Sequence, residues 1–194
     1  MKEMEQEKLK VEESLNIISE MISTTKYNIS QDKFIYLMWG YAVAFSSFGH
    51  YILQYQLDVK MAWLVWFTMP VAGIVNAIYF SRKKKNAKVL SFTDRALASV
   101  WKSFVAALFI FLFASPALGW DGVYPILMVL YGIGTAITGG IIKFRPLSIG
   151  GYLSMLVGFV AFYLGFEIQL FLLSLSVIFS FIIPGHLLPK KLNV

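Results

Sequence analysis

Apolar residues gather into long runs along nearly the whole chain, and short polar segments separate these runs. A helix of about 20 residues, rising 1.5 Å per residue, is long enough to cross a hydrocarbon core of about 30 Å. The runs are solidly apolar and lack the alternation that strands of a membrane β-barrel show. The pattern therefore predicts transmembrane helices over residues 34–54, 61–80, 103–120, 123–142, 147–165 and 168–188.

The distribution of charge agrees with this division, because charged residues crowd between the runs and none lies in the middle of one. A charged side chain at the centre of a membrane helix costs about 2.5–3.5 kcal/mol on insertion scales. The chain is 58% hydrophobic and 14% charged, whereas about a quarter of the residues in soluble proteins are charged. We predict an all-α membrane protein, a six-transmembrane-helix bundle over residues 34–188 with a short tail at 189–194.

Lysine and arginine predict the orientation of this bundle. Only Lys60 among the 17 basic residues falls in a segment that would lie outside, and cytoplasmic loops are the ones enriched in basic residues. Both termini are therefore expected in the cytoplasm. The densest basic run is Arg82, Lys83, Lys84 and Lys85. Because it adjoins the end of a span, we interpret it as a topology anchor to anionic lipid, worth about 1 kcal/mol per residue, and not as a nucleic-acid site.

Residues 1–33 precede the first span and carry a periodic apolar pattern. The spacings of four, three, four and seven predict an amphipathic helix, with the apolar positions Val11, Leu15, Ile18, Ile22 and Ile29. One interpretation places this helix on the inner leaflet or against the protein's own cytoplasmic loops. The other makes Leu15, Ile18 and Ile22 a docking surface for a protein partner. The first is preferred, because the heptad register is interrupted at Thr25.

Few polar residues lie within the spans. Ser46, His50 and Gln54 recur every four residues and therefore share one face of a helix. This face, together with Asn76 in the second span, would line a vestibule for a small polar solute in one interpretation. In the other, the same side chains are hydrogen-bond partners between helices. The structural interpretation is preferred, because polar residues near the end of a span need no special purpose.

No pattern in the chain indicates an enzyme. The acidic residues lie outside the spans, and the chain has no cysteine. The two histidines, His50 and His186, are expected at opposite faces of the membrane, so one protomer cannot bring both to one metal. We therefore predict no catalytic residue, no metal site and no cofactor.

Small residues in the fourth and fifth spans are spaced for close helix packing. They recur every four residues at Gly132, Ala136 and Gly140, and again at Gly150, Ser154 and Gly158. Packing within the bundle is preferred over a homo-oligomer, because six helices must first pack against one another. Near the middle of the second span, Pro70 is expected to kink the helix, and it is an open question whether it marks a gate. Ser91–Arg95 predicts the start of a helix that runs on into the third span.

Several short motifs resemble those of a group of uncharacterised six-span inner-membrane proteins of Bacteroidota-type bacteria. They are Trp39-Gly40 with His50-Tyr51, Lys143-Phe144-Arg145-Pro146-Leu147 followed by Gly150-Gly151, and Pro184-Gly185-His186. The resemblance implies a multi-pass protein of the bacterial inner membrane, and it supplies no functional residues. The preferred function is non-enzymatic, through interaction with protein or lipid. The alternative is a small permease or channel, or a substrate-binding transporter subunit similar in size and span number to the S components of energy-coupling-factor importers.

Overall fold

The computed structural model describes residues 11–23, 33–84 and 92–188, and no strand occurs among these residues. The predicted all-α fold class is confirmed. In the described part of the chain, four helices are long and apolar enough to cross a membrane, which supports a membrane protein. They cover Ala62–Arg82, Phe92–Phe113, Trp120–Ile141 and Phe166–Leu187.

The first and fifth predicted spans are also helical, but they are a weaker match to a bilayer. Helix α2 (Lys33–Tyr51) continues through a π-helical turn, η1 (Ile52–Gln56), and it is not among the four helices that are long and apolar enough to cross a membrane. Helix α7 (Arg145–Ala161) has 17 residues, which corresponds to a length of about 26 Å. That all six helices cross the membrane therefore stays a prediction.

The second span differs in detail from the prediction. It begins with a 3-10 helix, η2 (Ala62–Phe67), and changes to an α-helix at α3 (Thr68–Lys84). Pro70 therefore lies in the first turn of α3, where backbone N–H groups have no partner within the helix. The proline thus stands where an α-helix starts and removes no hydrogen bond from the interior of that helix, so the kink stays a prediction.

The third span was placed too far along the chain. Helix α4 (Phe92–Phe113) begins near the predicted start signal and ends well before residue 120. A short helix, α5 (Ser115–Leu118), follows with Pro116 in its first turn, and Gly119 then adopts a φ of 73°. Such a φ suits glycine and ends the helix. Helix α6 (Trp120–Ile141) starts directly afterwards, so the predicted loop at Asp121–Gly122 is wrong.

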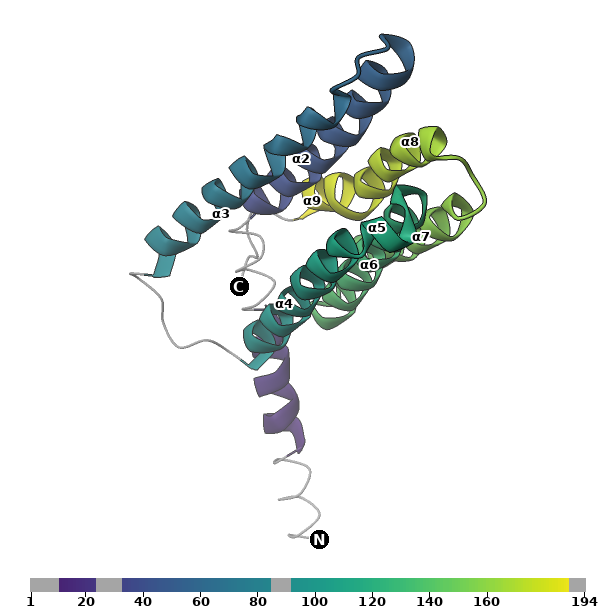
Figure 1. Ribbon diagram of the computed structural model, residues 1–194. Helices are drawn as coiled ribbons and strands as arrows, with labels where there is room; N and C mark the ends of the chain where they lie inside the picture. Colours follow the sequence, from purple (N-terminus) through teal and green to yellow (C-terminus); the bar gives the residue numbers. More distant parts are fainter. Residues whose placement is uncertain (1–10, 24–32, 85–91, 189–194) are drawn as a thin grey trace, which may run out of the picture.

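The C-terminal helical stretch forms the centre of the bundle. It consists of α8 (Phe166–Val177), a π-helical turn η3 (Ile178–Ile182) and α9 (Ile183–Leu187). Leu170, Leu173 and Val177 are buried in the main apolar cluster with side chains from α2, α6 and α7. Helices α2, α6 and α7 pack around this stretch (Figure 1).

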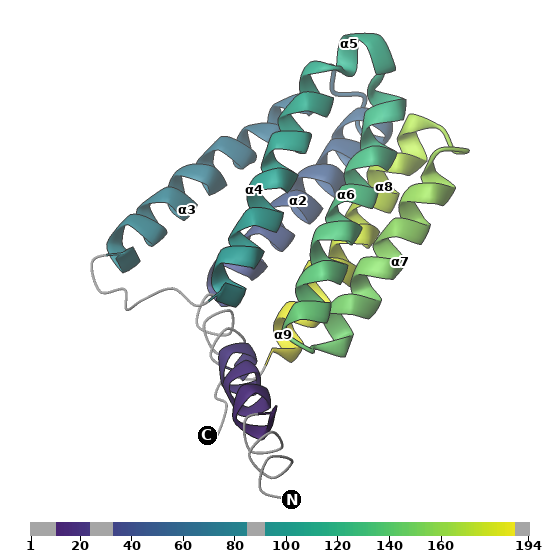
Figure 2. The same ribbon diagram turned by 90° about the horizontal axis from the view of Figure 1, so that it is seen from below.

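Helices α3 and α4 lie at the periphery, α3 against α2 and α4 against α6 (Figure 2). In the most apolar stretch of each, 6% of the residues are buried, against 56% in α6. Their exposed side chains are large and apolar, as Phe109 and Phe113 illustrate. In lipid such a surface needs no protein cover, because hydrocarbon tails are as apolar as the side chains.

The most extensive helix contact joins α6 to α7. A Cβ atom added to Gly132 would lie 2.6 Å from the carbonyl oxygen of Gly151, and one added to Gly151 would lie 2.5 Å from the backbone nitrogen of Ala136. Gly150 and Gly158 likewise have no room for a Cβ atom, whereas Gly140 has none of these contacts within 4 Å. The small-residue pattern therefore packs helices within the bundle, with Gly140 as an exception.

Gly132→Ala should destabilise the bundle, because the added methyl group meets the backbone of α7. Overpacking of this kind costs about 1–3 kcal/mol, so the midpoint of thermal unfolding in detergent should fall by several degrees. Gly140→Ala, on the same helix but with open space, is the matched control and should leave the midpoint unchanged or raised. Equal midpoints for the two variants would contradict the close contact.

Candidate functional site

The predicted polar face centres on His50, in the last turn of α2. The Trp66 indole N–H donates to His50 Nδ1 at 3.1 Å, and His50 Nε2 lies 2.7 Å from Gln54 Oε1. An indole nitrogen is only a donor. His50 Nδ1 must therefore be unprotonated, so the neutral ring carries its proton on Nε2 and donates it to Gln54. Both ring nitrogens are thus engaged inside the protein.

An aromatic cluster surrounds this histidine and joins four elements. The His50 ring makes edge contacts with Trp66 of η2, at 6.5 Å between centroids, and with Phe166 of α8, at 6.0 Å. Tyr124 of α6 packs edge-on against Phe166 at 5.1 Å and against Trp66 at 5.8 Å. Such edge-to-face pairs are favourable beyond the area they bury. His50 therefore helps to hold one end of the bundle together.

Ser46 is the third residue of the predicted polar face, after His50 and Gln54, that makes hydrogen bonds inside the bundle. Its hydroxyl lies 2.5 Å from Thr68 Oγ1 and 3.3 Å from the carbonyl oxygen of Val65, to which Thr68 also donates at 2.9 Å. These hydroxyls provide donors where η2 changes into α3. Asn76 stands apart, eight residues beyond Thr68, or about 12 Å along α3. Its Oδ1 is buried and without a hydrogen-bond partner.

Gln169 is a buried polar residue that the predicted site left out. Its side chain is 1% exposed, and its Nε2 lies 2.9 Å from Asp121 O, 3.0 Å from Ala161 O and 3.0 Å from Leu164 O. Pro125 lies four residues after Asp121 and has no N–H to give to that carbonyl. One amide thus joins α6, α7 and α8 at the end of the bundle that also contains His50. The signal for this contact in the sequence was the presence of Pro125 and Gln169 within otherwise apolar runs.

Serine hydroxyls connect the central helices in the same way. Ser47 donates to Leu170 O at 2.6 Å, and Ser174 donates to Ala44 O at 3.1 Å, so α2 and α8 are bonded in both directions. Ser154 of α7 donates to Met128 O at 2.9 Å. The polar groups deep in the bundle therefore serve mainly to bond helix to helix, as expected in lipid.

The two histidines are far apart along α2: His50 belongs to its last turn, and His186 of α9 contacts its first half. The hydroxyl of Tyr41, in that first half, lies 2.8 Å from His186 Nε2. Within the described ranges, no group of three His, Cys, Asp or Glu side chains lies close enough to hold a metal ion. Each histidine instead makes hydrogen-bond contacts with side chains of its own bundle.

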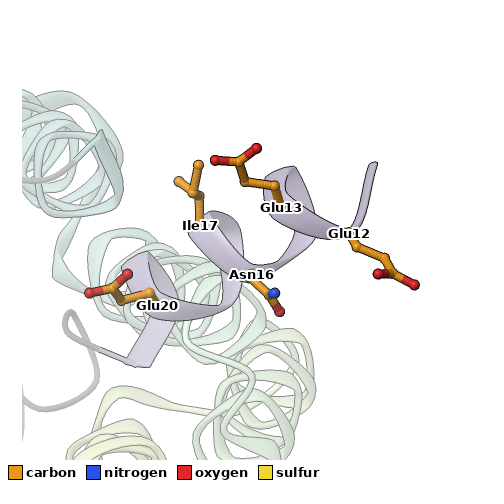
Figure 3. A pocket seen from close by; sticks show the side chains of 5 residues that line it. All are labelled: Glu12, Glu13, Asn16, Ile17 and Glu20. Carbon is orange, nitrogen blue, oxygen red and sulfur yellow. The ribbon is translucent and has the colours of Figure 1, made fainter. Parts of the chain in front are cut away.

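The candidate interaction helix is described over residues 11–23, and it projects from the end of the bundle where α4 begins (Figures 1 and 2). Leu15 is 59% exposed and Ile18 is 51% exposed, while Ile22 is half-buried. The hollow on this helix is lined by residues of the helix alone, which are Glu12, Glu13, Asn16, Ile17 and Glu20 (Figure 3). It is therefore an open surface and not a pocket within the bundle.

The basic run is described only in part. Arg82 is exposed in the last turn of α3, and the backbone of Lys83 and Lys84 completes that helix. Lys85, like Ile29 of the N-terminal pattern, lies outside the described residues.

Comparisons of this chain with protein-family models, with curated proteins and with solved structures gave no match. The function must therefore be argued from the residues themselves.

Gln169→Leu should lower the stability of the bundle, because the buried carbonyl oxygen of Ala161 and the part-buried ones of Asp121 and Leu164 would lose a shared donor. Each unpaired buried group costs about 1–3 kcal/mol, so a clear fall in the unfolding midpoint is expected. Gln56→Leu, at an exposed position in η1, makes the same chemical change without these contacts. An equal effect of the two substitutions would mean that the Gln169 amide contributes nothing specific.

Proposed function

We propose that this protein is a non-enzymatic protein of the bacterial inner membrane that binds a protein partner through its N-terminal helix. The observation that carries the proposal is a contrast between two regions. Hydrogen bonds within the bundle engage His50 and Ser46, whereas the helix of residues 11–23 exposes apolar side chains outside the bundle.

The amphipathic character of this helix supports a docking role. Val11, Leu15, Ile18 and Ile22 follow the i, i+4, i+7, i+11 spacing of one helix face, and Glu13 and Glu20 fall on the opposite face. Burial of apolar surface contributes roughly 25 cal/mol per Å² removed from water. A partner that covers this face would therefore stabilise the complex.

Charge favours a protein partner over the lipid surface. Residues 1–33 contain seven acidic residues and five lysines, and the described helix of residues 11–23 contains Glu12, Glu13 and Glu20 without a lysine or arginine. Helices that bind in the plane of a membrane are usually rich in basic residues, and the cytoplasmic leaflet is itself negatively charged. An acidic helix is repelled by such a surface, so a neutral or basic protein surface is the better partner.

The proposed setting is a bundle with six spans and both termini in the cytoplasm, as in the Bacteroidota-type group that the chain resembles. The distribution of charge supports this orientation. Helix ends near Lys33, Arg82, Arg95 and Lys143 are basic, whereas the outer segments carry Lys60 with acidic residues such as Glu167.

A solute permease is the second candidate, and Asn76 is the observation that favours it. The Oδ1 atom of this residue is buried without a hydrogen-bond donor, which is costly in an apolar setting. A bound polar solute would supply that donor. The proposal of a permease is weaker, because Ser46 and His50, the other residues of the predicted polar face, are engaged with protein groups.

The partner can be sought by native mass spectrometry of the protein extracted from its own membrane in polymer nanodiscs. We expect a stoichiometric protein partner, and we expect it to be lost when Leu15, Ile18 and Ile22 are all changed to serine. Exchanging Asn16 and Ser19 for alanine, on the polar side of the same helix, is the control and should retain the partner.

Two results would contradict the proposal. One is a species without a protein partner, and the other is a partner that survives the triple substitution. A retained small molecule that disappears in Asn76→Ala or His50→Ala would instead establish the permease.

The orientation can be tested by single-cysteine labelling, because the chain contains no native cysteine. A membrane-impermeant maleimide applied to intact spheroplasts should label cysteines placed at Lys60 and Glu167. Cysteines at Arg95 and Lys143 should react only after the membrane is opened. Labelling of Arg95→Cys or Lys143→Cys in sealed spheroplasts would exclude the proposed orientation.

A further inference from the structure

The C-terminal helical stretch contains an interruption in its regular α-helical hydrogen bonding. Between α8 and α9 the chain makes the π-helical turn η3, in which the N–H of Ile183 bonds to Ile178 O, five residues back. Pro184 follows at once and has no N–H for Ser180 O, which it would serve in an α-helix. π-helical turns are rare in proteins. Where they occur, they frequently lie at functional sites.

A single side chain from α2 supplies the missing donor. The hydroxyl of Tyr36 donates to Ser180 O at 2.7 Å, and the Tyr36 ring stacks on Phe181 with 4.7 Å between centroids. In lipid no water can replace this bond, and an unpaired carbonyl there is costly. Tyr36 therefore fastens η3 to α2 at the carbonyl that Pro184 cannot serve.

The parts before and after Pro184 are held very differently. Phe181 packs against Trp101 of α4 and Tyr131 of α6, with centroids 5.8 Å and 5.6 Å away. Beyond the proline, the polar contacts between α9 and α2 are exposed to solvent. Lys33 Nζ donates to His186 O at 3.0 Å, and the Tyr41 hydroxyl lies 2.8 Å from His186 Nε2. Exposed polar contacts contribute little. Apolar packing continues past the proline, because Pro184, Gly185 and Leu188 are buried, so the two sides differ in their aromatic and polar contacts.

We propose that η3 and Pro184 form a hinge in the last span, and that Tyr36 is the latch that keeps it shut. When Tyr36 releases Ser180 O, α9 moves relative to α8 while Phe181 stays anchored. Helix α9 packs closely against the N-terminal part of α2, because a Cβ atom on Gly185 would lie 2.6 Å from Leu37 Cδ2. This contact defines the closed position of the hinge. This hinge does not depend on the proposed partner.

The latch can be tested by hydrogen–deuterium exchange of the full chain in nanodiscs. Tyr36→Phe keeps the ring and removes only the hydroxyl group. Exchange in peptides covering residues 178–188 should rise about tenfold, which corresponds to about 1.4 kcal/mol and is the expected size for a lost buried hydrogen bond. Tyr152→Phe, at an exposed position on α7, is the matched control and should change nothing.

A second substitution separates a latch from a general stabilising bond. Pro184→Ala restores an N–H for Ser180 O, so Tyr36→Phe in that background should raise exchange by less than about twofold. The hinge would be overturned by the same tenfold rise in both backgrounds. It would also be overturned by no rise, or by a rise spread equally over α6 and α7, because Tyr36 would then stabilise the whole bundle.

Discussion

Hydrogen bonding of backbone carbonyls in an apolar setting is the constraint on which the structure depends. Each proline inside a helix removes one donor, and lipid offers no water to replace it. Here the carbonyl of Asp121, left open by Pro125, accepts from Gln169, and that of Ser180, left open by Pro184, accepts from Tyr36. In both cases the donor comes from another helix, so local repair also fastens helices together.

Close backbone contact is the second means by which the bundle is held. Burial of apolar side chains gives helices in lipid little reason to associate. The α6–α7 pair instead gains van der Waals contact, because Gly132 and Gly151 let the two backbones touch. The helices outside this centre, α3 and α4, have no such contacts with each other and present apolar side chains outward. The tight part of the molecule is therefore the set α2, α6, α7 and α8.

This division bears on the proposed function. The polar groups of the interior, such as His50 and Ser46, are occupied with neighbouring helices. Exposed apolar and acidic groups are instead found together on the helix of residues 11–23. A protein that works through contacts and not through chemistry needs a rigid membrane part and an accessible recognition segment, and the proposal assigns these two roles to the bundle and the helix.

The sequence by itself determined the fold class, the approximate place of the helices and the apolar stripe before the first span, because hydrophobic runs and their spacing are local properties. It did not predict where the helix of the third span ends or that Pro70 lies in the first turn of an α-helix, since the limits of a helix depend on turns such as that at Gly119. Only the tertiary structure decided which polar residues bond one helix to another. Gln169 and Tyr36 gain their roles from carbonyls about 48 and 144 residues away along the chain, and no local pattern records which helices will meet.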